Sequence, residues 1–135
     1  MTSALLCVAM AIYFEARGEE QVEGRIAIAE VIENRVKDPR FPSDSCAVVR
    51  QGRYWDGVPI LNECQFTFYC DGKAEIINDY QSWLVALYIA SQSLNGELAT
   101  VTGGATHYHS KSVDPYWSHT GELTQVIGSH LFYKL

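Results

Sequence analysis

Glu15 is the residue whose type and position best suit acid–base chemistry. It follows an unbroken apolar run over residues 4–14 and precedes a break at Gly18. Burial among apolar side chains disfavours a charged carboxylate and raises its pKa, which suits a general acid that works near neutral pH. The pattern leaves open an alternative, in which Glu15 is a helix-end carboxylate paired with Arg17 or Arg25.

A glycosidase that uses two carboxylates holds them at a defined separation across the scissile bond. The acids available to partner Glu15 are Glu19 and the loop residues Glu63 and Asp114. Glu19 is one helical turn further on, but it follows Gly18, and the alternative is that its side chain turns outward. Spacing places none of them beside Glu15, so a one-carboxylate mechanism is also considered. In that mechanism Glu15 protonates the leaving glycosidic oxygen and then, as a base, helps a sugar hydroxyl to close on the anomeric carbon.

Histidines near the C-terminal end offer a second kind of chemistry. His107 and His109 alternate on a predicted strand and therefore point to the same side, as two ligands of one zinc ion would. The other possible ligands have no spacing typical of a zinc site: Asp114, His119 and His130. We predict no metal and no cofactor. We expect His107 or Tyr108 to hydrogen-bond a sugar, with structural histidines as the alternative.

Aromatic side chains in predicted loops and on exposed strand faces suit the apolar faces of sugar rings. The alternative for each is packing in the core, where aromatics of small domains are often found. These residues are Tyr54, Trp55, Tyr69, Tyr108, Tyr116 and Trp117.

The elements that must position these residues are mainly helical. The apolar run is too short to cross a bilayer, which needs about 20 apolar residues, and too uniformly apolar for a surface helix. We therefore predict a buried central helix that Ser3 caps and that Gly18, with the acidic pair Glu19 and Glu20, ends. A packing helix follows over residues 21–37, with Glu30 among the charged residues on the side opposite its apolar stripe.

The middle of the chain predicts shorter elements. We expect a short helix at residues 45–51, a turn-rich loop at 51–62 and an amphipathic core helix from 78 or 79 to 94. Residues 64–70 alternate apolar and polar side chains, which predicts a strand with Phe66 and Phe68 inward. The outward residues of that strand are Gln65, Thr67 and Tyr69. Beyond them we expect a strand at 105–110, a short helix at 121–127 and an edge strand at 130–133.

Length and composition exclude several classes of protein. A chain of 135 residues with 47% hydrophobic and 19% charged residues is typical of one folded domain. The net charge of −6, without a run of Lys or Arg, argues against nucleic-acid binding. The N-terminal segment has neither the basic region nor the cleavage site of a signal peptide. Export by another route, or earlier removal of a signal, is then expected of a protein that works outside the cytoplasm.

The four cysteines leave several pairings open. Cys7 lies in the predicted central helix and is expected to be a small core residue. A straight strand would hold Cys64 and Cys70 about 20 Å apart, beyond disulfide reach. One of them then pairs with Cys46, or a turn brings Cys64 and Cys70 together; three free thiols are the remaining alternative.

Taken in order, several blocks of the chain resemble the cell-wall hydrolase family typified by the spore cortex-lytic enzymes of SleB and CwlJ type. The blocks span nearly the whole chain and lie at residues 13–19, 28–36, 64–68, 104–109 with 115–117, and 127–133. The resemblance implies a mainly helical, lysozyme-like α+β domain with a small sheet. It also implies cleavage of peptidoglycan between N-acetylmuramic acid and N-acetylglucosamine, as a lytic transglycosylase that leaves an anhydro-muramic end.

The family's catalytic glutamate matches Glu15. Its cleft-lining positions fall on Gln65, Thr67, Thr106, His107, Tyr108 and Trp117, to which the outward face predicted for residues 64–70 adds Tyr69. Arg17, Asn34 and Arg35 look like supports that tie the motif of Glu15 to the second helix.

The chain departs from many spore members in having Tyr13-Phe14 before the glutamate and in lacking their wall-binding domain. It therefore also resembles a phage endolysin, or an excised domain of an exported hydrolase. We expect a monomer that acts on bacterial peptidoglycan at the cell wall, in the periplasm or outside the cell, without stable insertion in a membrane. The competing hypotheses are a hydrolytic muramidase with a second carboxylate, a zinc-dependent amidase or peptidase, and a non-catalytic glycan-binding module.

Overall fold

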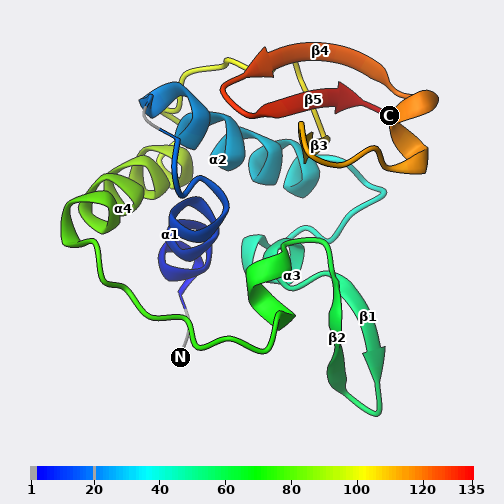
Figure 1. The fold of residues 1–135 in the computed structure, drawn as a ribbon. Helices are drawn as coiled ribbons and strands as arrows, with labels where there is room; N and C mark the ends of the chain where they lie inside the picture. Colours follow the sequence, from blue (N-terminus) through cyan, green and yellow to red (C-terminus); the bar gives the residue numbers. More distant parts are fainter. Residues whose placement is uncertain (1–2, 20) are drawn as a thin grey trace.

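The computed structural model describes residues 3–19 and 21–135, so Glu20 of the predicted helix break lies outside it. The described residues form helices, a hairpin and a small sheet (Figure 1). The helices are α1 (Ala4–Glu15), α2 (Val22–Lys37), α3 (Ser45–Val49) and α4 (Tyr80–Leu94). The strands are β1 (Gly52–Trp55), β2 (Val58–Cys64), β3 (His107–Ser110), β4 (Glu122–Ile127) and β5 (His130–Lys134), and two 3-10 turns lie at η1 (Thr67–Cys70) and η2 (Tyr116–His119).

The helix α1 lies at the centre of the domain, with α2, α3 and α4 around it (Figure 1). Its side chains are buried on most sides, because a uniformly apolar helix must be covered on every face. Ser3 caps it by accepting a 3.2 Å hydrogen bond from the backbone N–H of Leu6. Gly18 follows with a φ of +87°, a left-handed conformation that glycine adopts without strain. The predicted central helix and its cap are confirmed. No helix in the described ranges is both long and apolar enough to cross a bilayer.

The two longer surface helices begin and end close to the predicted residues. The carboxylate of Asp79 caps α4 through a 3.1 Å bond from the N–H of Ser82. In α2 the prediction for Glu30 is wrong, because its side chain is buried. Glu30 accepts hydrogen bonds from the backbone N–H groups of Val101 (2.5 Å) and Thr102 (3.1 Å). A carboxylate is stable there because backbone donors replace its water.

Residues 51–62 form a hairpin, not the predicted loop. Strands β1 and β2 pair antiparallel and extend away from the helices (Figure 1). Trp55 stands at the turn, with 78% of its surface exposed, so it does not fold back onto the core.

The prediction of a strand at residues 64–70 is wrong in its backbone, but its burial pattern is confirmed. Phe66 and Phe68 are buried, and Gln65 and Thr67 are exposed. The chain nevertheless coils into η1, which brings the Cα atoms of Cys64 and Cys70 to 6.1 Å and allows them to form a disulfide.

The second disulfide joins Cys7 of α1 to Cys46 of α3. Cys7 is therefore not a free core thiol, and Cys46 pairs with neither Cys64 nor Cys70. The turn that was predicted as one alternative for Cys64 and Cys70 is confirmed. The error for Cys7 arose because a buried helix position is compatible with either a thiol or a disulfide, and only the position of α3 decides between them.

The C-terminal part of the chain forms an antiparallel sheet in the order β3-β5-β4. The predicted helix at 121–127 is wrong, because these residues form strand β4 and pair with β5. Thr124, Val126 and Ile127 are β-branched and suit a strand. The predicted edge strand at 130–133 is wrong in position, since β5 is the central strand.

Candidate active site

A cavity of about 510 Å³ opens where the end of α1 meets β3 and the segment that follows β2. The side chains around it are polar and aromatic. They include Phe14, Glu15, Gln65, Thr67, Tyr108, His109, Trp117 and His130. A cavity of this size with a few convergent polar groups is the usual form of a small-molecule or sugar site.

Glu15 is the only carboxylate among the described residues that line this cavity. Burial raises the pKa of Glu15 above its ordinary value of 4.5, against hydrogen bonds from Tyr108, Thr67 and the backbone of Phe68 that lower it. The nearby negative charge of Asp71 adds to the increase. A carboxyl group in this environment can hold a proton closer to neutral pH and release it to a substrate.

Tyr108 fixes the orientation of the Glu15 side chain. Its hydroxyl group donates a short hydrogen bond to Oε1 of Glu15 from the middle of β3. Burial and the neighbouring Glu15 charge raise the pKa of Tyr108 well above its ordinary value, so its phenol remains a donor. Next to Glu15 in the sequence, the Phe14 ring stacks on that of Phe68, with ring centroids 5.3 Å apart, and this contact holds η1 against α1.

Of the seven predicted substrate-binding residues, four line this cavity: Gln65, Thr67, Tyr108 and Trp117. The other three have different surroundings in the described part of the chain. Tyr69 lines a separate apolar cavity with Met10 and Val49. Thr106 is buried, and its hydroxyl group bonds Nδ1 of His107 at 2.9 Å. The His107 ring packs between Phe41 and Trp117.

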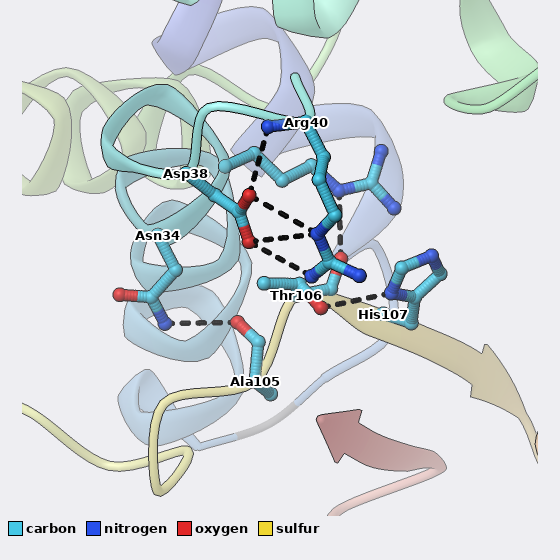
Figure 2. A network of polar contacts seen from close by, with 7 residues as sticks. Asn34, Asp38, Arg40, Ala105, Thr106 and His107 are labelled. Carbon is cyan, nitrogen blue, oxygen red and sulfur yellow. Dashed lines mark hydrogen bonds and ion pairs between the residues drawn. The ribbon is translucent and has the colours of Figure 1, made fainter. Parts of the chain in front are cut away.

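The start of β3 is held by the C-terminal half of α2. Asn34 donates to the carbonyl oxygen of Ala105 at 2.8 Å, and the buried Arg35 donates to that of Thr106 at 2.7 Å. Figure 2 shows the Asn34–Ala105 bond beside the Thr106–His107 contact. Asn34 and Arg35 thus support the strand that carries Tyr108, whereas the prediction that they tie down the motif of Glu15 is wrong.

His107 and Arg17 have surroundings that differ from those predicted. Burial and the positive charges of Arg35 and Arg40 together lower the pKa of His107 to about 4. Arg40 forms an ion pair with Asp38 in the same network (Figure 2). Arg17, just past the end of α1, lies over the rings of Tyr13 and Phe14 of that helix, so it does not connect α1 to α2 as predicted.

Each predicted second acid is engaged elsewhere. Glu63 forms a 2.8 Å ion pair with Arg53 on the hairpin, and Asp114 pairs with His119 at 3.0 Å. Glu19, predicted to turn outward, is buried. Among the described residues, no ion pair joins Glu15 to an arginine. The alternative that Glu15 is a salt-bridged helix end is therefore wrong.

Two cavity residues, His109 and His130, were considered from sequence only as zinc ligands. His109 instead bonds the Tyr133 hydroxyl group at 2.9 Å, and His130 bonds Glu19 at 3.1 Å. No cluster of three or more His, Cys, Asp or Glu side chains suited to a metal occurs in the described ranges. The sequence signal for His130 was its place in the strand-like run 130–133. Only the pairing of β5 with β3, which is a tertiary property, brings it close to Tyr108 and His109.

A glutamate with a raised pKa at the end of a central helix, facing a polar cavity beside a small sheet, defines a lysozyme-like domain. The predicted mainly helical, lysozyme-like α+β fold is confirmed by similarity to two solved structures. The catalytic domain of the Bacillus cereus SleB protein matches with a TM-score of 0.70 and 27% identity, over 97% of this chain and 89% of that one. The catalytic domain of the germination-specific lytic transglycosylase SleB from Bacillus anthracis matches with a TM-score of 0.72 and 28% identity, over 97% and 93%.

Residues 19–133 match the model of the cell wall hydrolase family. The spore cortex-lytic enzyme of Halalkalibacterium halodurans is 32% identical over 126 residues, which are 93% of this chain and 33% of that protein. The chain thus spans about a third of the length of this curated relative. It belongs to the cell wall hydrolase family, as the resemblance predicted.

Proposed function

We propose that this domain is a lytic transglycosylase that cleaves peptidoglycan between N-acetylmuramic acid and N-acetylglucosamine. The observation that carries the proposal is Glu15, whose pKa is raised by burial, in a cavity lined, within the described residues, by no other carboxylate. A hydrolysing glycosidase of the common type needs a second carboxylate to activate water or form a covalent intermediate. The name of the Bacillus anthracis relative, a lytic transglycosylase, supports the same reaction.

Glu15 carries both proton transfers of this reaction. Its protonated carboxyl group donates to the glycosidic oxygen as the bond to the anomeric carbon breaks. The resulting carboxylate, still held by Tyr108, then takes the proton of the sugar's own C6 hydroxyl group as that oxygen bonds the anomeric carbon. The ring closes to an anhydro-muramic end, and Glu15 returns to its protonated form.

The cavity residues that contact the sugars in this proposal are Gln65, Thr67, Tyr108 and Trp117. The exposed polar side chains of Gln65 and Thr67 offer hydrogen bonds, and Trp117 offers a ring face to a sugar. Tyr69, Thr106 and His107 are not among the described residues that line this cavity, so we assign them supporting rather than direct contacts.

We further propose that residues 1–135 form one catalytic domain that acts as a monomer at the wall, in the periplasm or outside the cell. Two disulfides support this location, since disulfides persist mainly in oxidising compartments. Size-exclusion chromatography with light scattering tests the monomer, and a dimeric mass contradicts it.

The experiment that tests the reaction is mass spectrometry of fragments released from purified peptidoglycan by wild type and by Glu15→Gln. Anhydro-muropeptides from wild type alone are expected. Reducing-end disaccharides would show a hydrolytic muramidase and a missed second acid. Free peptides would show an amidase or peptidase, and wall binding without any released fragment would show a glycan-binding module.

A further inference from the structure

The second glutamate of the motif, Glu19, is enclosed by hydrogen-bond donors from the β4–β5 turn. Its Oε1 accepts from the backbone N–H of Ser129 at 3.1 Å, from the Ser129 hydroxyl group at 2.5 Å and from Nδ1 of His130 at 3.1 Å. Gly24 lies against the same side chain, and a Cβ atom there would meet Cγ of Glu19 at 3.2 Å. Glu19 is therefore built into the fold as the partner of one histidine.

This partner determines which nitrogen of His130 carries the proton. Burial raises the pKa of Glu19, but the hydrogen bonds from Ser129 outweigh it and leave the pKa below 4.5, so the group is ionised. An ionised carboxylate only accepts hydrogen bonds, so Nδ1 of His130 is the donor. In the neutral ring the lone pair is then on Nε2.

The ring of His130 also borders the Glu15 cavity, so its other nitrogen is the one left for a ligand there. Its side chain is 13% exposed and lines the Glu15 cavity, and no hydrogen bond from another described residue reaches Nε2. The ring stands edge-on to that of Tyr108, with centroids 5.3 Å apart, and Tyr108 in turn bonds Glu15. Tyr108 thus contacts both Glu15 and the ring of His130, whose Nε2 has no partner among the described residues.

We propose that His130 accepts a hydrogen bond at Nε2 from a sugar hydroxyl group in the cavity, and that Glu19 is the positioning residue that holds its ring and tautomer. The identity of the ligand as a sugar rests on the proposed function. A hydroxyl group carries one hydrogen, so the group that bonds His130 is a different one from the C6 hydroxyl group that gives its proton to Glu15. Its bond to His130 fixes the sugar in the cavity, and alignment of the reacting atoms lowers the barrier.

The decisive variant is His130→Asn. The asparagine amide nitrogen can replace Nδ1 as the donor to Glu19, but the side chain has no group at the place of Nε2. We expect kcat on peptidoglycan to fall at least about tenfold, the size of one lost hydrogen bond, with an unchanged unfolding temperature. His119→Asn is the matched control, because His119 also pairs with a carboxylate but is 63% exposed and lies outside the cavity lining.

A pH profile separates an acceptor role from a purely structural one. The titratable groups facing His130 are Glu19, which precedes α2, and His109 and Tyr108, which lie on β3. Protonation of His130 turns Nε2 into a donor, so wild type loses activity on the acid side through this ring. His130→Asn lacks that loss if the proposal holds, and a variant with the wild-type rate and profile overturns it.

The variant Glu19→Ala tests the tautomer independently. It removes the acceptor that holds the proton on Nδ1, so the ring proton can move to Nε2, a change that ¹⁵N NMR of the histidine side chain detects. We expect reduced kcat together with this change, and full activity in the flipped tautomer overturns the proposal.

Binding of a soluble N-acetylglucosamine tetramer gives a readout that needs no cleavage. The tetramer is expected to shift the His130 Nε2 resonance of wild type and to bind more weakly to His130→Asn. Failure to release anhydro fragments would reject the proposed reaction, whereas tetramer binding unaffected at His130 would reject this inference alone.

Discussion

Glu15 and Glu19 lie four residues apart in one motif, yet their surroundings push their pKa values in opposite directions. Burial dominates at Glu15, and three hydrogen bonds only partly offset it, so its pKa is raised. At Glu19 the hydrogen bonds from Ser129 and His130 outweigh burial, so its pKa is lowered. One glutamate is suited to give a proton, and the other to remain charged and hold a neighbour.

The two glutamates differ in which groups of the protein donate hydrogen bonds to them. Glu15 ends α1, and its main partner is the Tyr108 phenol, which lines the same cavity. Glu19 follows Gly18, where the chain has left the helix and can turn its side chain toward the β4–β5 turn. Environment, more than residue type, therefore assigns the roles of acid and support.

Removal of the Glu19 side chain is expected to have the largest effect on stability. Glu19→Ala leaves the Ser129 N–H, the Ser129 hydroxyl group and Nδ1 of His130 without their acceptor. We expect the free energy of unfolding to fall by about 3 kcal/mol, as for other lost hydrogen bonds to a buried charge. Urea unfolding followed by circular dichroism measures it. Glu33→Ala, which removes an exposed i,i+4 ion pair with Lys37, is the control and should change little. Equal losses in both variants would contradict the comparison.

The dependence of stability on pH should separate the two glutamates. A raised folded-state pKa means that Glu15 contributes stability present below pH 4.5 and lost as pH rises through that pKa. A lowered one means that Glu19 contributes stability present above pH 4.5 and lost as pH falls through its folded-state pKa.

Thermal unfolding of wild type, Glu15→Gln and Glu19→Gln across a pH series checks this prediction. Glu15→Gln should gain stability relative to wild type as pH rises, and Glu19→Gln should lose the acid-side dependence. Parallel profiles for the two variants would show that the two environments are alike.

Tyr108→Phe should have the smallest effect, on the pH profile of activity. The hydroxyl group of Tyr108 lowers the pKa of Glu15, so its loss raises that pKa further. The alkaline side of the activity profile is then expected to move to higher pH, because the acid keeps its proton longer. Rates on peptidoglycan measured across pH test this. Tyr54→Phe, which loses a bond to the Arg50 carbonyl oxygen on the hairpin, is the control. A shift in the acid direction would assign Tyr108 a different electrostatic effect.

Local patterns in the sequence predicted what depends on neighbours along the chain. The apolar run, the Ser3 cap and the break at Gly18 define α1 and the position of Glu15, because helix signals act within a few residues. The alternation over residues 64–70 likewise predicted which side chains are buried.

The tertiary structure decided what depends on partners far along the chain. The backbone of residues 64–70 follows a turn because Cys64 and Cys70 meet, and residues 122–127 form a strand because β5 lies beside them. Glu30 is buried because Val101 and Thr102 supply donors to it. For the same reason Glu19, which looked like a second acid or an outward-facing side chain, is the partner of His130. A sequence specifies which groups need partners, whereas only the folded chain determines which partners they find.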